Sequence, residues 1–439
     1  MSVLGSQFVP RKICRYITLE TVLTYAARDW EISGLSAGAL RTCSEVEVGM
    51  KRLVLSVGSA LLIIASGLLA NNSTRAVLAD PQTSVSFGKA ITFNSEVLFP
   101  TSLAAGDLNG DGFPDLAVVS EDDDQGLAYG FGSGNGRFGL WRDYADIETV
   151  PFFVLLADAD GDGNLDALTT DIGCCDDIGM AFGDGKGGFH GSQFLTVGGG
   201  NDGTATVAVA DLNGDGIPDI VGTSLGAGGQ LGSVFVLLGK GHRKFAKAFG
   251  FSSDGQQPHG IAVGDLNHDG IPDLAVANAD SGGVTVFLGK GDGTFGKPTH
   301  YRVGAGTWTL VLGDFNGDGN LDMAVGAFSN RIYVLLGNGD GTFGPSRGYA
   351  GGSGVVAAAD FNGDGKLDLA TARGGVSVLL GNGDGTFQKP VDFDVHGAPG
   401  DLIVADFNHD GKPDIATISA PSTAAVLLNT TPFPTSSHP

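Results

Sequence analysis

One acidic segment has the residue types and the spacing of a site for a hard metal ion. In the stretch GDLNHDGIPDLAV, Asp265, Asn267 and Asp269 occupy alternate positions, Gly270 follows, and Asp273 closes a nine-residue loop. Carboxylates this close together repel one another, so something must compensate for their charge. Glycine at the sixth position permits a backbone turn that other residues resist. Oxygen ligands at positions one, three and five, a carbonyl at seven and a carboxylate at nine resemble the first part of a calcium loop.

The same pattern occurs seven times, with its first aspartate at intervals of 46 to 54 residues. Turns favour Asp and Gly, but turn chemistry does not require the full acid spacing in every copy. In the second copy Asp160 replaces Asn, which adds a charge that can tighten the site. The predicted ligands are Asp107, Asn109, Asp111 and Asp115; Asp158, Asp160, Asp162 and Asp166; Asp211, Asn213, Asp215 and Asp219; Asp265, Asn267, Asp269 and Asp273; Asp314, Asn316, Asp318 and Asp322; Asp360, Asn362, Asp364 and Asp368; and Asp406, Asn408, Asp410 and Asp414.

The residues on either side of each loop have the pattern of β-strands. In the fourth copy IAVGD leads into the loop and PDLAVANA leaves it, followed by GGVTVFLG, the Asp-Gly turn KGDGTF and the polar, alternating GKPTHYRV. Apolar inner strands and a water-facing outer strand suit sheets packed between neighbouring sheets. A repeat of about 50 residues is the size of a propeller blade, so the sequence predicts an all-β, seven-bladed β-propeller with four-stranded blades.

The last copy lacks a fourth strand, since STAAVLLNTT passes directly into PFPTSSHP. The segment SFGKAITFNSEV, residues 86–97, precedes the first copy and is similar to a fourth strand of the other copies. We therefore expect the N-terminal segment to supply the outer strand of the last blade. Ring closure of this kind removes an exposed edge that would otherwise invite aggregation.

The N-terminal part differs in composition from the repeats. Residues 50–70 hold two basic residues and then an uncharged apolar stretch, as in a secretory signal, and small residues suited to cleavage follow. The alternative is a membrane anchor, because the 18 residues from Leu53 to Ala70 are just long enough to span a bilayer. We expect a mis-assigned extension at 1–49, a signal peptide at 50–79, the propeller at 84–431 and a flexible tail at 432–439. The mature protein is then extracellular, or faces outward from a membrane if the 53–70 segment is kept.

Composition excludes some partners and leaves the cysteines without a role. The net charge is −24 although only 17% of residues are charged, so the acidity reflects a scarcity of Lys and Arg. Nucleic acid is not an expected partner, because no basic cluster is present to neutralise phosphates. Cys14 and Cys43 lie in the extension, and the adjacent Cys174 and Cys175 cannot build a disulfide framework.

The repeats resemble the FG-GAP, or VCBS, repeats that form the integrin α-chain propeller and occur in many secreted bacterial proteins. The resemblance covers about residues 84–431, and the pattern D-x-[ND]-x-D-G-x-x-D is complete in each copy. It implies calcium bound between the first and second strands of a blade, with the carbonyl of Ile271 as a further ligand in the fourth copy. It also implies binding or adhesion, without identifying a ligand, because one fold hosts many functions.

We expect up to seven calcium ions with a structural role. The large ligand set with a carbonyl favours calcium over magnesium. A site that binds at about 0.1 mM in about 1 mM calcium contributes about 1.4 kcal/mol. Seven such sites would contribute on the order of 10 kcal/mol, which is comparable to the net stability of a domain.

Three functions stay open: a protein- or glycan-binding or adhesion module, a carbohydrate-active enzyme that uses the face opposite the calcium loops, and a structural component of the envelope. GTSLG at 222–226 matches a hydrolase elbow, but strand and loop residues surround it. GDGTFG at 291 and 339 matches a phosphate loop, but each copy lies in a hairpin. The lack of a recognisable acid/base pair favours a binding or structural role, and we expect a monomer.

A ligand is expected on the face opposite the calcium loops. Those loops and the Asp-Gly turns both follow odd-numbered strands, so they share one face, and the loops of the other face vary most between copies. There Trp308, Gln256 and Gln257 could stack on and hydrogen-bond a sugar, and Asp122–Asp124 would attract cations or a basic partner. The alternative is that these loops are idle, since loops vary freely when nothing constrains them.

Overall fold

The computed structural model describes residues 84–433, apart from 96, 121–125, 145–146, 148–150, 173–176, 199–202, 227–230, 353 and 373. The chain divides into two compact units, residues 1–79 and 80–439, and the described residues all belong to the second. Every element within them is a β-strand, and no helix there is long and apolar enough to cross a membrane. Outside them lie the expected extension, the signal or anchor segment, most of the expected tail, all four cysteines and Asp122–Asp124.

The described strands form seven antiparallel sheets of four strands each. The first three blades are β2 (Pro100–Gly106), β3 (Asp115–Ser120), β4 (Leu127–Gly132) and β5 (Phe138–Tyr144); β6 (Phe153–Ala157), β7 (Asp166–Thr170), β8 (Asp177–Gly183) and β9 (Phe189–Thr196); and β10 (Thr204–Ala210), β11 (Asp219–Ser224), β12 (Ser233–Leu237) and β13 (Phe249–Ser252).

The next three blades are β14 (Pro258–Gly264), β15 (Asp273–Asn278), β16 (Gly283–Phe287) and β17 (Thr299–Arg302); β18 (Thr307–Gly313), β19 (Asp322–Ala327), β20 (Arg331–Leu335) and β21 (Arg347–Ala350); and β22 (Val356–Ala359), β23 (Asp368–Ala372), β24 (Val376–Leu379) and β25 (Val391–Phe393). The seventh is β26 (Pro399–Ala405), β27 (Asp414–Ser419), β28 (Thr423–Leu427) and β1 (Ile91–Asn94).

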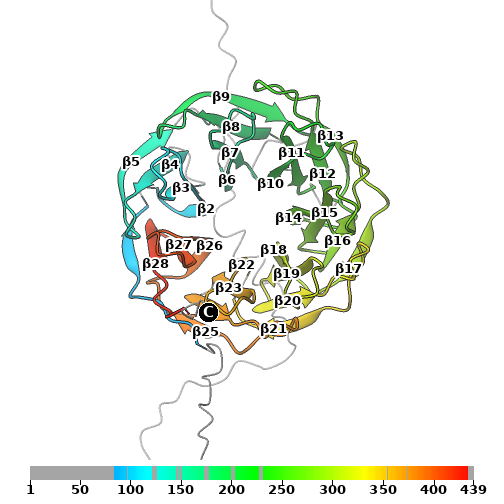
Figure 1. The fold of residues 1–439 in the computed structure, drawn as a ribbon. Helices are drawn as coiled ribbons and strands as arrows, with labels where there is room; N and C mark the ends of the chain where they lie inside the picture. The colour runs from blue at the N-terminus through cyan, green and yellow to red at the C-terminus, as the bar shows by residue number, and fades with distance from the viewer. Residues whose placement is uncertain are drawn as a thin grey trace, which may run out of the picture. The chain divides into compact units, whose positions relative to one another are not determined.

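The blades are arranged in a ring, which confirms the predicted seven-bladed β-propeller (Figure 1). The first strand of each blade lies nearest the centre of the ring and the fourth lies at the rim. Successive blades follow one another around the ring in chain order, so each acidic loop has the next copy as its spatial neighbour.

The core of the propeller lies between neighbouring blades. The second strand of every blade is buried along its whole length, whereas an outer strand such as β17 is mostly exposed. Between the third and fourth blades, Val221 and Val234 pack in one cluster with Leu274 and Val276. Each such side chain contributes about 1.5–3 kcal/mol on burial, so stacking against both neighbours explains why the inner strands are apolar on both faces.

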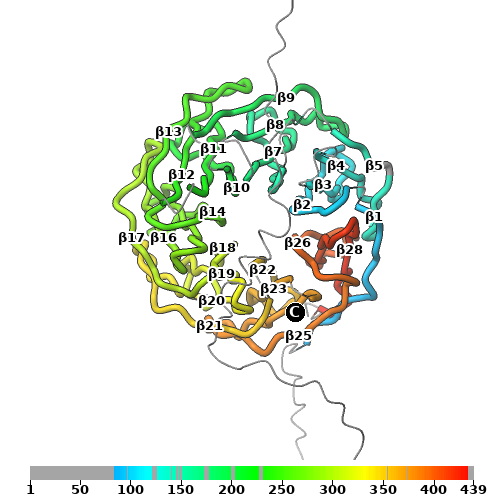
Figure 2. The backbone as a smooth tube through the Cα atoms, turned by 180° about the vertical axis from the view of Figure 1, so that it is seen from behind, coloured from blue at the N-terminus to red at the C-terminus, as the bar shows by residue number. Residues whose placement is uncertain are grey.

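The seventh blade is closed by the N-terminal strand, as expected from the sequence. β1 pairs with β28 in register from Ile91 with Val426 to Asn94 with Thr423. The pairing continues outward, because Gly88 donates its N–H to the carbonyl of Leu428 at 2.8 Å. Figure 2 shows β1 beside β28, with the first and seventh blades adjacent. The pairing gives hydrogen-bond partners to the backbone N–H and C=O groups of β28, which would otherwise form an exposed sheet edge.

Candidate metal centres

Each acidic loop joins the first strand of a blade to the second, and its first aspartate organises the backbone. In the first loop, Asp107 Oδ1 accepts N–H bonds from Gly110 and Asp111 at 2.7 and 3.2 Å, and Oδ2 accepts one from Gly112 at 2.9 Å. Gly112 has a φ of 89°, which favours glycine at the sixth position of the loop. The bond from the sixth-position glycine recurs in the other six loops at 2.8–2.9 Å.

The third and fifth residues of each loop point their side chains back into it through short local bonds. Asn109 Oδ1 accepts the N–H of Asp111 at 2.8 Å, and Asp111 Oδ1 accepts the N–H of Phe113 at 2.8 Å. The Asn109 amide also donates to Asp111 Oδ2 at 3.0 Å, as do the equivalent amides of Asn267 and Asn316 in their own loops. These local bonds therefore fix the side chains at positions one, three and five within the loop.

The ninth residue does more than the sequence indicated, because its buried carboxylate anchors the loop to the blade. Asp115 Oδ2 accepts the N–H of Leu108, the second loop residue, at 2.9 Å, and Oδ1 accepts the N–H of Gly132, at the end of the third strand, at 2.8 Å. The same pair of bonds occurs in all seven blades at 2.7–3.0 Å. All seven of these aspartates are fully buried: Asp115, Asp166, Asp219, Asp273, Asp322, Asp368 and Asp414.

Burial raises the pKa of every one of these seven carboxyls, because a charge in a poorly solvated site is unfavourable. The two backbone N–H bonds to each carboxylate oppose the shift, and nearby loop aspartates increase it. The pKa is raised to about 6 for Asp115, Asp166 and Asp322 and to about 7 for Asp368 and Asp414. Ionisation of these buried carboxyls is therefore unfavourable, and a cation beside them would favour the ionised form.

The structure places all of the predicted ligands within their own loops and brings three carboxylates together in the second. The oxygens of Asp158, Asp160 and Asp166 lie within 4.8 Å of one another, and no other described group of His, Cys, Asp or Glu meets that spacing. The remaining loops have Asn at the third position, so an amide oxygen stands in for one carboxylate. This all-oxygen donor set fits a hard divalent cation such as calcium.

The Asp-Gly turns between the third and fourth strands are hairpins that also contact the acidic loop of the preceding blade. Gly341 donates its N–H to the carbonyl of Leu266, the second residue of the fourth loop, at 3.0 Å. Corresponding bonds occur at four other junctions, and at a sixth the Asn429 amide donates to Phe361 at 2.8 Å. Gly341 has a φ of 80°, and a Cβ there would lie 2.6 Å from Leu288. The repeated NGDGT sequence thus links neighbouring blades, a role that the sequence alone did not reveal.

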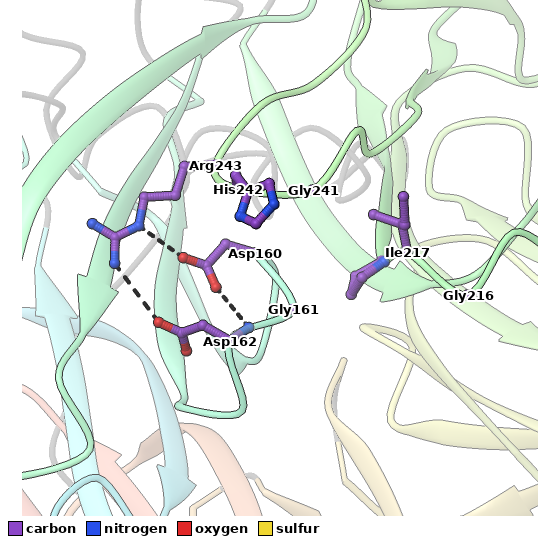
Figure 3. A pocket seen from close by; sticks show the side chains of 9 residues that line it. Asp160, Gly161, Asp162, Gly216, Ile217, Gly241, His242 and Arg243 are labelled. Atoms are coloured by element: carbon purple, nitrogen blue, oxygen red, sulfur yellow. Dashed lines mark hydrogen bonds and ion pairs between the residues drawn. The ribbon is translucent and has the colours of Figure 1, made fainter.

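The junction between the second and third blades differs, because Arg243 stands at the glycine position of the hairpin. Its Nε lies 2.8 Å from Asp160 Oδ2 and its guanidinium lies 3.7 Å from Asp162 (Figure 3). Residues 160–162, 216–218 and 241–243 line a cavity of about 490 Å³ beside this ion pair. Sequence reasoning missed Arg243, although a signal was present. GKGHRKF departs from the NGDGTF pattern, and it does so in the repeat that follows the one loop with Asp at position three.

The histidines at the fourth loop position also join neighbouring loops. His268 has a φ of 61°, and its Nε2 lies 2.9 Å from the Asn320 side chain in the next loop. His409 packs on Phe113 across the junction of the seventh and first blades, with ring centroids 4.7 Å apart. Neither histidine was predicted to be a metal ligand, and both contact the seventh residue of the following loop.

On the opposite face, Trp308 belongs to an aromatic group rather than to a loop, which corrects the expectation from the sequence. It lies in β18, at a register irregularity between Thr307 and Leu310, and stacks on His259 of β14 with centroids 3.6 Å apart. Phe328 lies 4.6 Å from Trp308, and Phe152 of the second blade lies 6.3 Å away. Trp308 is therefore partly buried by packing.

The two glutamines on this face are already engaged in local contacts. The Gln257 amide donates to the carbonyl of Gly226 at 3.3 Å, and the backbone N–H of Gln256 donates to Ser281. Among the described residues, the hydrolase-like GTSLG stretch ends one strand, β11, and the next element is another strand, β12. Ser224, at its centre, is the last residue of β11 and is buried.

Comparison with known families identifies the repeats. The FG-GAP-like repeat matches residues 158–222, 267–325, 314–371 and 360–417, and the FG-GAP repeat matches residues 99–136. Integrin alpha-PS5 of Drosophila melanogaster is 35% identical over 164 residues, which cover 32% of this chain and 16% of that protein. Phosphatidylinositol-glycan-specific phospholipase D of Mus musculus is 31% identical over 149 residues, 26% of this chain and 17% of that protein. The chain thus spans less than a fifth of these relatives.

Solved structures share the fold at low identity. An Agrocybe aegerita lectin described as recognising non-reducing terminal N-acetylglucosamine is 19% identical, with a TM-score of 0.52 over 79% of this chain and 96% of the lectin. BBS1N in complex with ARL6DN is 13% identical, with a TM-score of 0.56 over 79% of this chain and 97% of BBS1N. These likenesses concern the propeller fold.

Proposed function

The chain belongs to the FG-GAP repeat family, and from that premise we propose that it is a secreted, calcium-stabilised propeller that binds a glycan or protein ligand. The observation that carries the calcium part is the sevenfold recurrence of one oxygen-lined loop with a buried carboxylate anchor. The similarity to integrin α chains and to phosphatidylinositol-glycan-specific phospholipase D supports the binding part of the proposal.

Calcium bound in each loop would neutralise the crowded carboxylates. Residues one, three, five and nine of a loop would hold it, as with Asp265, Asn267, Asp269 and Asp273 in the fourth blade. The ninth residue has an oxygen on each of two backbone donors, and each oxygen keeps a lone pair for an ion. Because the same residue is bonded to the second loop residue and to the end of the third strand, an ion held there would also stiffen the blade.

Calorimetry and melting test the calcium part together. We expect titration of the purified protein with calcium to show several sites, and removal of calcium with EDTA to lower the melting midpoint by many degrees. Returning calcium in excess should restore the midpoint. If no heat of binding is detected and EDTA leaves the melting curve unchanged, the calcium proposal is wrong.

We place the ligand on the face opposite the acidic loops, where large apolar side chains are exposed. The exposed fractions are 51% for Phe328, 49% for Phe99 and 55% for Leu231. Phe328 and Trp308 of the fifth blade form an aromatic surface near the centre of the ring. Phe152 of the second blade and His259 of the fourth blade contact Trp308 there. Aromatic rings beside polar groups are suited to stack on the apolar face of a sugar while its hydroxyls are hydrogen-bonded.

A glycan array that includes terminal N-acetylglucosamine, probed with calcium-loaded protein, tests this surface. Phe328→Ala is the cleaner variant, because Trp308 also packs on buried His259 and its loss would disturb the fold. We expect Phe328→Ala to weaken binding without changing the calcium stoichiometry. Phe194→Ala, on the outer strand β9 with 39% exposure, is the matched control and should bind normally. Binding that survives Phe328→Ala but is abolished by changes on the calcium face would refute this placement.

A further inference from the structure

The second acidic loop and the hairpin that contacts it depart from the repeat pattern together. Asp160 stands where the other six loops have Asn, and Arg243 stands where the hairpins at 134–136, 185–187, 291–293, 339–341 and 383–385 end in glycine. Arg243 keeps the left-handed backbone of that glycine, with a φ of 63°, although its side chain makes this conformation costly. The strained position therefore needs a compensating interaction of the arginine side chain.

Arg243 is held over the second loop by contacts on several sides. Its Nε donates to Asp160 Oδ2 at 2.8 Å, and the guanidinium lies 4.2 Å from the centre of the Phe182 ring. Its Nη2 lies 3.7 Å from Asp162 Oδ2 and 3.1 Å from His190 Nε2. The Asp160 side chain is only 3% exposed, so this ion pair is shielded from water on the aspartate side.

The guanidinium performs the task that an amide performs in other loops. In the first loop, Asn109 Nδ2 donates to Asp111 Oδ2 at 3.0 Å and so joins positions three and five. In the second loop the corresponding atoms are both carboxylate oxygens, which would repel one another. Arg243 bridges Asp160 and Asp162, and its positive charge offsets the additional carboxylate of this loop.

We propose that Arg243 is a built-in cation of the second loop, which holds this loop together without calcium and weakens the binding of calcium there. The calcium statement rests on the proposed function, and the statement about the calcium-free loop does not. A divalent ion among Asp158, Asp160 and Asp166 would lie close to the guanidinium, so binding must work against like-charge repulsion. The cavity beside Arg243 gives the side chain room to move aside when an ion enters.

The first experiment counts calcium ions by native mass spectrometry at a series of free calcium concentrations. Arg243→Gln should bind one of its ions about tenfold more tightly than the wild-type protein, because a like charge has been removed. Arg243→Lys should stay close to wild type. Arg142→Gln is the matched control, since Arg142 also lies over a Phe ring and bonds the hairpin carbonyl of Gly187, but forms no ion pair with any described acidic residue. Equal binding by wild type and Arg243→Gln, or the same gain in Arg142→Gln, would overturn the proposal.

The second experiment needs no calcium and uses melting in EDTA. Arg243→Gln should lower the midpoint, since Asp160 and Asp162 then face each other uncompensated. Adding Asp160→Asn, which restores the amide of the other loops, should recover most of that loss. If the change in melting midpoint of the double variant equals the sum of the changes in the two single variants, Arg243 does not have the proposed role. If no calcium binds anywhere, the proposed function fails, while this cycle still reports on Arg243.

Discussion

Acidification is expected to stabilise the calcium-free propeller, because the ninth-position carboxyls take up protons when the chain folds. Their pKa values in the folded protein are raised by burial, to about 6 or about 7 in five of the seven, from an ordinary value of 3.8. A carboxyl with a raised pKa stabilises the fold fully below pH 3.8, and this contribution is lost as the pH rises through 6 to 7. Without calcium, stability should therefore rise from neutral pH to about pH 5.

The size of the effect follows from the pKa shifts. Between about pH 7.5 and pH 5, a carboxyl with a folded pKa of about 6 contributes roughly 1 kcal/mol, and one with a pKa of about 7 roughly 2–3 kcal/mol. Asp401 lies outside the loops and is partly buried; desolvation raises its pKa to about 6, so it adds to the effect. His259 opposes it by about 2 kcal/mol, because burial lowers its pKa to about 3 and the folded state cannot take up its proton. The five loop carboxyls together outweigh His259.

Thermal melting in calcium-stripped buffer with EDTA measures this effect. We expect the midpoint to rise by about 5–10 °C from about pH 7.5 to pH 5. Saturating calcium should reverse the trend, because the ion binds ionised carboxylates and protons compete with it. An Asp401→Asn variant should keep the rise, which separates the loops from that residue. A calcium-free midpoint that stays level or falls on acidification would refute the reasoning.

Three further changes test other parts of the structure. Deleting residues 84–97 should remove β1, leave β28 as an open edge and yield an aggregating protein by light scattering; a stable monomer would contradict the closure. Gly341→Ala should cost about 1–3 kcal/mol more in denaturant unfolding than Gly216→Ala, since both have positive φ but only Gly341 is crowded by Leu288; equal costs would contradict the hairpin contact. Asp318→Asn should lower the calcium count by one at limiting calcium and barely change melting in EDTA, whereas an unaltered count would argue against that site.

Much of the architecture was predictable from the sequence because it depends on local pattern. Seven copies of one acidic loop at a regular spacing, each between apolar runs, predicted seven four-stranded blades. The missing fourth strand after Leu427 and the strand-like 86–97 segment predicted the closure. The loop geometry was also predictable, since the first aspartate bonds backbone groups only three to five residues away. Such contacts are determined by the order of residues along the chain.

Contacts between blades were decided only by the tertiary structure. The Asp-Gly hairpin donates to the preceding copy, so its role does not follow from a single repeat. Within a blade, the ninth aspartate bonds a glycine or asparagine 13 to 20 residues away, which the local spacing of the loop does not indicate either. Trp308 looked like a loop residue, but ring closure brings it against His259 and Phe152 from other blades. Arg243 is 83 residues from Asp160, and only stacking of the second and third blades makes the two a pair. A repeat pattern specifies each blade, while the charges and rings that meet between blades depend on how the ring assembles.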